Sequence, residues 1–397
     1  MRPPTVPVPP VGYEEHHWSV PRDGRYSRSV ASAGTGIHHS SIPAQIQDLQ
    51  LSLPGDLAVQ VDEATERLSA FDQHALVLLG KDAKTLGPMS SVLLRTEATS
   101  SSQIENLTVG ARQLALWQVD SSASPSAAAV MGNVRAMESA LATDELIDSK
   151  KILLLHRRLM EETPGWEAHA GRYRDELVWV GRSSASPANA TFVAPQQELV
   201  SAAVEDLARF VAREDLPVLV QAAIAHAQFE TIHPFVDGNG RTGRALVHTI
   251  FRTKGLLKNS TAPISAGLLR DTEGYFETLT AYRDGDAGPI FEAFAGAAWF
   301  AAQSGMALMD ELATHLDQAK ANLAGLRSDA NAWKVLPLLI SHPALGGFAP
   351  AAAVRTLNLL EEREVLVERS GARRNRVWMH EGILGTLDDY AEQLRRG

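Results

Sequence analysis

The sequence contains no cysteine, which excludes disulfide bonds and metal sites built on thiolates. It also lacks an uninterrupted apolar run of about 18 residues, the length needed to cross a bilayer. The nearest candidate, residues 289–309, is interrupted by Glu292 and Gln303 and is better explained as a buried helix. The first ten residues lack the apolar core of a signal peptide. Together these absences predict a cytoplasmic protein that has no membrane partner.

The residues that are present give the composition of an ordinary folded protein. The chain has 397 residues, of which 45% are hydrophobic and 21% are charged, enough for two or three domains with sizeable cores. Its formal net charge of -10 at pH 7 argues against broad affinity of the whole molecule for nucleic acid.

The most informative stretch of the sequence is HPFVDGNGRTGR at residues 233–244. The almost uniformly apolar residues 216–232 precede it, with Asp215 as the expected N-cap and Pro217 in the first turn, and they predict a buried helix. A His-Pro pair then ends this helix, because a residue before proline avoids the helical conformation. Residues 241–254 resume a helical pattern. The stretch therefore joins two predicted helices, with its glycines at the N-terminus of the second.

This position favours the binding of an anion. Unpaired N–H groups and the helix dipole attract negative charge to a helix N-terminus, and Gly238 and Gly240 let a phosphate approach the backbone closely. Arg241 and Arg244, three residues apart, can both donate charge-assisted hydrogen bonds to phosphate oxygens. The residues therefore predict a site for a nucleotide polyphosphate.

Two further side chains of the stretch indicate chemistry in addition to binding. Asp237 is a hard oxygen ligand, suited to hold Mg²⁺ against the same phosphates. His233 can accept a proton from an incoming hydroxyl near neutral pH. Residues 238–243 also satisfy the G-x-G-x-x-G pattern of dinucleotide-binding folds, but that pattern requires a preceding strand, and here a helix precedes it. A dinucleotide-binding site is therefore excluded.

Taken in order, these residues resemble the signature of the Fic family, His-Pro-Phe-x-Asp-Gly-Asn-Gly-Arg-x-x-Arg, which is matched without a gap or substitution. The resemblance implies a mainly α fold, a Fic-type helical bundle with a β-hairpin flap. It also implies transfer of AMP from ATP to a Ser, Thr or Tyr hydroxyl of a protein target, the chain itself included, with His233 as the catalytic base and Asp237 holding Mg²⁺. The nucleotide-binding residues that it implies are Phe235, Gly238, Asn239, Gly240, Arg241 and Arg244.

A segment at residues 93–106 resembles the inhibitory helix that accompanies Fic motifs. Ser101 and Glu105 share one face if this segment is helical, and Ser101-x-x-x-Glu105-Asn106 matches the inhibitory pattern. In that family the glutamate pairs with the second arginine of the motif, here Arg244, and keeps the γ-phosphate from seating. Some relatives also use this glutamate to remove AMP, so Glu105 could serve a reverse reaction. A solvated glutamate on a polar helix face is the alternative.

Two other regions match features of the family. Residues 177–180 and 191–193 flank a turn rich in Gly, Ser, Pro and Asn, which predicts a hairpin. Its position matches the Fic flap, which holds the target segment by strand addition, and a surface hairpin without a role is the alternative. Tyr275 and Phe276 begin another predicted helix, where related proteins place an aromatic pair beside the adenine. Aromatic residues at helical spacing can equally be part of the core.

The sequence predicts four consecutive regions. Residues 1–41 are rich in Pro, Ser, Gly and His without periodicity and predict a disordered tail, whose paired histidines are better explained as solvated than as metal ligands. Residues 42–120 form an N-terminal helical region with the inhibitory helix at about 95–106. Residues 121–327 form the Fic catalytic core, and residues 328–397 form a small winged-helix-like α+β domain.

The C-terminal region departs from the usual winged-helix pattern. Between Pro343 and Leu366 only one helix fits, so the middle helix of the pattern is missing. A basic hairpin with Arg369, Arg373, Arg374 and Arg376 keeps contact with DNA open, ranked below a packing or dimerisation role. The rival to an adenylyltransferase is therefore a DNA-binding regulator that uses the Fic site as a nucleotide sensor. Relatives that dimerise make a homodimer a further expected partner.

Overall fold

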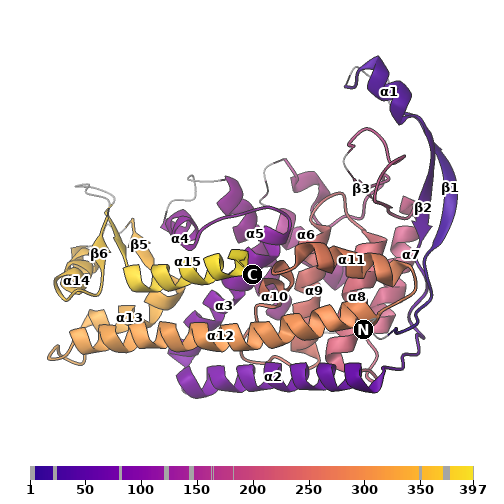
Figure 1. The fold of residues 1–397 in the computed structure, drawn as a ribbon. Coiled ribbons are helices and arrows are strands. Elements are labelled where there is room, and N and C mark those ends of the chain that lie inside the picture. Colours follow the sequence, from indigo (N-terminus) through magenta and orange to yellow (C-terminus); the bar gives the residue numbers. More distant parts are fainter. Residues whose placement is uncertain are drawn as a thin grey trace. The chain divides into compact units, whose positions relative to one another are not determined.

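The computed structural model describes residues 5–20, 25–79, 83–119, 125–142, 147–161, 163, 165–181, 183–347, 351–369 and 376–396. The described chain is mainly helical, as the sequence predicts (Figure 1). Packing divides it into two compact units, each assembled from separate segments. The first unit consists of Met1–Val61, Ser139–Lys254 and Glu273–Phe294, and the second of Asp62–Glu138, Gly255–Thr272 and Ala295–Gly397. The two packing units do not coincide with the four consecutive regions predicted from the sequence, and that division into regions stays a prediction.

The first unit is organised around α8 (Val218–Ile232), whose residues are buried from Leu219 to its end. Helices α7 (Gln197–Val211) and α9 (Asn239–Thr253) pack against it, and α6 (Ser149–Met160) packs against α9. A helix that is apolar on every side has no face suited to water and becomes the centre of its unit. The two helices predicted on either side of the 233–244 stretch are thereby confirmed.

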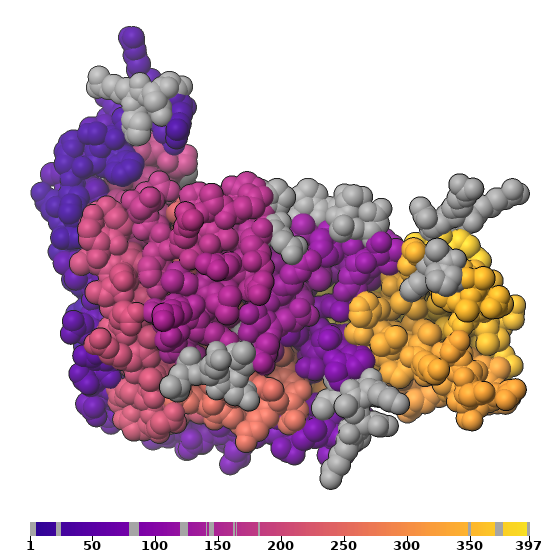
Figure 2. Space-filling view, turned by 180° about the vertical axis from the view of Figure 1, so that it is seen from behind, coloured from indigo at the N-terminus to yellow at the C-terminus, as the bar shows by residue number. Residues whose placement is uncertain are grey.

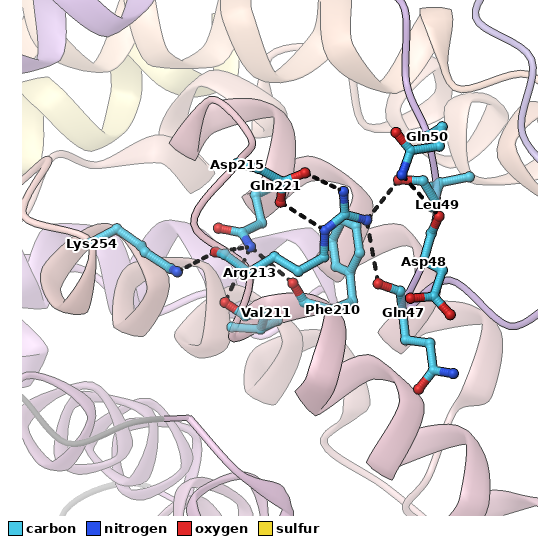
Figure 3. Close-up of polar contacts among 10 residues, drawn as sticks. All are labelled: Gln47, Asp48, Leu49, Gln50, Phe210, Val211, Arg213, Asp215, Gln221 and Lys254. Atoms are coloured by element: carbon cyan, nitrogen blue, oxygen red, sulfur yellow. Dashed lines mark hydrogen bonds and ion pairs between the residues drawn. The ribbon is translucent and has the colours of Figure 1, made fainter.

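The start of α8 differs from the prediction. Asp215 does not cap the helix; its carboxylate accepts hydrogen bonds from Arg213 Nε at 2.9 Å and Nη2 at 2.7 Å, and Pro217 takes the N-cap position (Figure 3). Gln221, in the first turn, donates from Nε2 to three carbonyls at and just after the end of α7, at 2.9 to 3.1 Å. A bidentate pair with a guanidinium is stronger than a single bond to a backbone N–H, which explains why the carboxylate points to Arg213.

The predicted disordered tail is wrong for the described residues between 5 and 42. Strand β1 (Gly12–Trp18) pairs antiparallel with β2 (Gly36–Ile42) along its whole length, and the short helix α1 (Arg28–Gly34) lies between them in the chain. Before β1 the backbone follows the turn around residue 285, with Val8 N–H bonded to Gly285 O at 3.0 Å. In Figure 2 this indigo segment lies along the pink residues of the first unit.

A second hairpin confirms the one predicted before the motif. Strands β3 (Trp179–Val180) and β4 (Phe192–Val193) pair antiparallel, and β2 lies next to β4. The Trp18 ring meets that of Trp179 edge-on, with centroids 5.3 Å apart. Its Nε1–H donates to Ala185 O in the β3–β4 connection at 2.9 Å. The N-terminal hairpin therefore braces the β3–β4 hairpin.

In the second unit, α3 (Ala83–Ile104) is the helix on which others assemble, and both α10 (Ile264–Leu269) and α13 (Asn331–Ser341) pack against it. Helices α2 (Gly55–Leu79), α5 (Pro125–Leu141) and α12 (Gly288–Asn322) continue from one unit into the other.

Other elements of the two units are α4 (Ala111–Val119), α11 (Thr272–Arg283), α14 (Ala351–Glu362), α15 (Glu381–Arg396) and the sheet β5–β7–β6 of Ala344–Gly346, Val377–Met379 and Val367–Glu368.

The C-terminal region has the predicted two helices and a hairpin, together with β5 and α15, which the sequence analysis did not anticipate. The two basic side chains of the hairpin that the structure describes are paired with acids. Arg369 Nε lies 2.8 Å from Glu381, and Arg376 Nη2 lies 3.2 Å from Glu361. The turn at residues 370–375 lies outside the described residues. These pairings weaken the argument for DNA contact, and the winged helix remains a prediction.

Within the part of the chain that the structure describes, no helix combines the length and the apolar character that crossing a bilayer requires.

Candidate functional site

His233 ends α8 in a left-handed conformation, with φ 48° and ψ 61°. Its N–H still makes the helical hydrogen bond to Phe229 O, at 2.9 Å, so His233 is the C-cap residue at which the chain leaves the helix. The side chain is 20% exposed, and its Nδ1 lies 3.4 Å from Glu230 O. Nδ1 also lies 3.7 Å from Glu230 Oε2. A neutral imidazole has one ring nitrogen that can accept a proton, as a general base requires.

Arg174 fixes the backbone around His233. The guanidinium donates to His233 O from Nε at 2.8 Å, to Glu176 O at 2.9 Å and to Pro195 O at 2.6 Å. Its own N–H bonds to Pro234 O at 3.0 Å. Burial lowers the pKa of this arginine to about 10, so it remains charged at neutral pH. Sequence reasoning missed Arg174, because an arginine that serves only backbone carbonyls has no partner visible in the sequence.

The loop after His233 is closed by a reciprocal pair of hydrogen bonds. Phe235 N–H donates to Asn239 Oδ1 at 2.9 Å, and Asn239 Nδ2 donates to Phe235 O at 2.8 Å. Gly238 has φ 75°, and a Cβ there would lie 2.9 Å from Leu159 Cδ2, so only glycine fits. Phe235 and Asn239 are 0% and 3% exposed. These two side chains therefore shape the loop, and the contact of Phe235 and Asn239 with the nucleotide stays a prediction.

His156 on α6 supports the loop from the opposite side. Gly171 N–H donates to its Nδ1 at 3.1 Å, so the ring hydrogen sits on Nε2, which lies 3.1 Å from Asp237 O. The ring stacks on Phe235, with centroids 3.6 Å apart and planes 6° apart. Burial lowers the pKa of His156 to about 4. The histidine is thus neutral at pH 7, with both ring nitrogens hydrogen-bonded, and no sequence pattern predicted this role.

The lowered pKa makes the stability of the protein depend on pH. The folded pKa of about 4 lies below the ordinary 6.5, so the contribution of His156 is complete above pH 6.5 and is lost as the pH falls toward 4. We expect His156→Phe to keep the stack, but its free energy of unfolding at pH 7 should be about 2–4 kcal/mol lower than that of wild type, because two backbone groups lose their hydrogen-bond partner. Between about pH 7 and pH 5, the free energy of unfolding should fall by about 2 kcal/mol less in this variant than in wild type, as measured by urea titration. The exposed His17→Ala is the control, and equal pH slopes in all three proteins would contradict the assignment.

The charged side chains of the motif lie at the start of α9. Arg241 and Arg244 are 4% and 3% exposed, and Arg241 Nη2 lies 3.3 Å from Asp237 Oδ2. Gly240 is half-buried in the first turn. The Asp237 side chain is 43% exposed, so its oxygens can reach a ligand. The start of α9 thus brings together the backbone N–H groups of a helix N-terminus, two arginines in the first two turns and the exposed carboxylate of Asp237 just before the helix.

The exposed carboxylate of Asp237 suits a Mg²⁺ ion that is held jointly by the protein and by the phosphates of a nucleotide. Among the described residues no cluster of three or more His, Cys, Asp or Glu side chains forms a protein cage for a metal. Mg²⁺ commonly binds through one or two carboxylates together with substrate phosphates and water. Asp237, exposed beside the anion-binding end of α9, supplies such a carboxylate.

The predicted aromatic pair is divided between core and surface. Tyr275 on α11 is 3% exposed, and its hydroxyl lies 2.6 Å from Nε2 of the buried His226. Phe276 is 48% exposed, with its ring centroid 5.2 Å from that of Tyr275. Tyr275 thus has a complete role in packing, whereas Phe276 is the member of the pair that a ligand can reach.

The residues of the predicted inhibitory helix lie in the second unit. Helix α3 ends at Ile104, two residues earlier than predicted, with Ser101 buried in its last turns and Glu105 in the turn that follows. Asn106 has φ 63°, and its N–H bonds to Gln103 O at 2.9 Å. Glycine and asparagine are the residues that most readily take this conformation at a helix end. The Gly/Asn position of the inhibitory pattern therefore has a physical reason here.

Comparison with known proteins agrees with this geometry. The Fic/DOC family model matches residues 146–251, which include α6, the β3–β4 hairpin and most of α9. A protein adenylyltransferase of Caenorhabditis elegans is 35% identical over 107 residues, which cover 26% of this chain and 19% of that protein. A probable protein adenylyltransferase of Aquifex aeolicus is 28% identical over 148 residues, which cover 37% of this chain and 39% of that protein.

A solved structure extends the likeness beyond the motif. A Fic family protein from Desulfovibrio desulfuricans G20 matches with a TM-score of 0.52 at 22% identity, over 83% of this chain and 97% of that chain. At this identity the match shows the fold alone. The matches to the two curated relatives span only 19% and 39% of their lengths. The family match and the geometry of residues 233–244 together show that this chain contains a Fic domain, at residues 146–251.

Proposed function

We propose that the chain is an auto-inhibited protein adenylyltransferase, which transfers AMP from ATP to a Ser, Thr or Tyr hydroxyl of a protein target. The observation that carries this proposal is the rigid loop of residues 233–239. It places a histidine next to the anion-binding end of α9. The names of the matched relatives, which are protein adenylyltransferases, support the same reaction.

The proposed reaction is a single displacement at the α-phosphorus. His233 accepts the proton of the target hydroxyl while that oxygen forms a bond to the α-phosphorus of ATP. The bond from the α-phosphorus to the oxygen bridging to the β-phosphorus breaks, and pyrophosphate leaves. Mg²⁺ held by Asp237 would neutralise phosphate charge. Most of the rate enhancement would come from positioning and from charge stabilisation.

Three groups of the motif would hold the ATP phosphates. The N–H groups of Gly238 and Gly240 lie at the positive end of α9 and would bind phosphate oxygens. Arg241 and Arg244 would orient the β- and γ-phosphates that leave. Phosphate-transferring relatives of the family replace the second glycine of the motif, so the glycine at position 240 favours AMP transfer.

The inhibitory part of the proposal rests on the Ser101, Glu105 and Asn106 pattern. Glu105 would pair with Arg244 and thereby exclude the γ-phosphate, because one guanidinium serves a carboxylate or a phosphate at a given moment. Removal of AMP with help from the same glutamate would be the reverse activity. The target segment would add as a strand to the β3–β4 hairpin, where Val180 is 49% exposed.

The test compares ATP labelled at the α-phosphate with ATP labelled at the γ-phosphate, each incubated with purified protein, Mg²⁺ and a cell lysate as the source of targets. We expect label on protein only from α-labelled ATP. Label only from γ-labelled ATP would show phosphate transfer, and no label from either would contradict the proposal.

A further inference from the structure

The second unit contains a pocket that is separate from the 233–244 motif. It lies between α3, α4 and α15 and is partly open to solvent. Its apolar wall includes Val92, Val109, Leu114, Leu387 and Leu394. Concave sites with apolar walls and a few polar groups are the usual binding sites of small molecules.

The polar groups of the pocket indicate the kind of ligand. Gln103 is 8% exposed, and neither its Nε2 nor its Oε1 has a hydrogen-bond partner among the described residues. Arg95 is the charged side chain among the described lining residues, and none of these is acidic. Its Nη1 donates to Ser341 O, which leaves donors on the other guanidinium nitrogens. Thr96 and Thr99 also line the pocket.

A buried amide without partners is unfavourable by about 1–3 kcal/mol for each unpaired group. A ligand carboxylate would accept hydrogen bonds from Gln103 Nε2 and from Arg95, while an apolar body filled the space against the leucines. An amine would meet the positive charge of Arg95, and a purely apolar ligand would leave Gln103 unpaired. The pocket therefore favours an apolar molecule with one carboxylate head.

The position of the pocket on α3 connects it with the predicted inhibitory residues. Its α3 lining residues, from Val92 to Gln103, recur at helical spacing along one face. With about 100° of rotation per residue, Ser101 lies on the roughly opposite face, and Glu105 follows in the turn after the helix ends. One helix thus carries a ligand pocket on one side and the inhibitory pattern on the other.

We propose that this pocket binds a compact apolar monocarboxylate and that binding holds α3 against α4 and α15. The proposed effect on catalysis rests on the proposed function, whereas binding itself does not. A ligand stabilises the conformation to which it binds. Occupation of the pocket would therefore strengthen inhibition by holding the helix that carries Ser101 and Glu105 in its present packing.

The first experiment measures binding of sodium octanoate to the full-length protein by calorimetry and by the shift in melting temperature. Gln103→Leu should weaken octanoate binding about tenfold, through the loss of a hydrogen bond to a charged group. The same variant should keep or raise the melting temperature without ligand, because an unpaired amide is replaced by an apolar group. Ala391→Phe, on the α15 wall, should abolish binding by filling the pocket.

Matched controls separate the pocket from unspecific association. Gln393→Leu changes an exposed glutamine of the same helix α15 and should bind octanoate like wild type. Octan-1-ol, which lacks the carboxylate, should bind more weakly than octanoate. Octanoate binding that is absent in wild type, or equal in wild type, Gln103→Leu and Ala391→Phe, would overturn the proposal.

The second experiment measures AMP transfer from α-labelled ATP with and without octanoate. We expect less label with octanoate in wild type and in Gln393→Leu, and no change in Ala391→Phe. Binding without any change in label would refute the regulatory part and leave the binding site established. Absence of label under all conditions would refute the proposed function, while the calorimetric result would still decide whether the pocket binds the ligand.

Discussion

Replacing Glu105 with glycine is expected to increase the AMP label on protein by roughly tenfold to a hundredfold. A hydrogen-bonded charge pair contributes about 1.5–3 kcal/mol, and its removal from the competition would release Arg244 for the γ-phosphate. The measurement is the initial rate of label transfer from α-labelled ATP, with wild type and variant at equal protein concentration. The affinity for ATP should also increase, because the carboxylate would no longer exclude the γ-phosphate.

Asn106→Gly is the matched control for this experiment. It changes the adjacent residue at the end of α3, where φ is 63°, a conformation that glycine takes without strain. The carboxylate of Glu105 stays, so the rate should remain that of wild type. Activation by Asn106→Gly to the same extent would show that loosening of the helix end, and not the loss of a charge, relieves inhibition.

Replacing His233 with alanine in the Glu105→Gly protein is expected to lower the rate of AMP transfer by about 10²–10⁴-fold, the usual contribution of a general base. The imidazole is the proposed acceptor of the hydroxyl proton, and alanine has no group to replace it. ATP binding should change little, because the proposed phosphate contacts come from the start of α9 and its two arginines. Rate and ATP affinity are therefore measured on the same samples.

The exposed His17→Ala, in the same Glu105→Gly protein, is the control for loss of a histidine, and it should transfer AMP at the unchanged rate. Equal rates with and without His233 would mean that another group or water takes the proton. A joint loss of rate and ATP affinity would point to collapse of the loop at residues 233–239, in which case urea titration would show lowered stability.

Much of the catalytic region could be predicted from the sequence, because its elements follow from local patterns. The apolar residues before the motif give α8, the His-Pro pair ends it, and the glycines mark the start of α9. The β3–β4 hairpin was also recognisable from its turn composition. In each case residues close in the sequence determine the structure, so periodicity and turn chemistry were sufficient.

The parts that were missed depend on residues far apart in the chain. Strand β1 has a run of four polar residues between Tyr13 and Trp18 and no apolar face, and its pairing with β2 and its contact with Trp179 lie beyond any local window. His156 and Arg174 support the loop through backbone carbonyls and an N–H group, which every residue possesses. Asp215 had the right position for a cap, but the competing Arg213 decided its direction.

The brace between the two hairpins has a consequence for the choice of target. A hairpin with two-residue strands would ordinarily sample many shapes, and a partner would have to select one of them at an entropic cost. Here Trp18 and the residues around it already restrict that sampling. A peptide that matches the exposed edge at Val180 would then bind with little ordering penalty, whereas a mismatched peptide would find no adaptable surface. Selectivity for few targets would thus arise from the N-terminal strands, far in sequence from the residues that perform the chemistry.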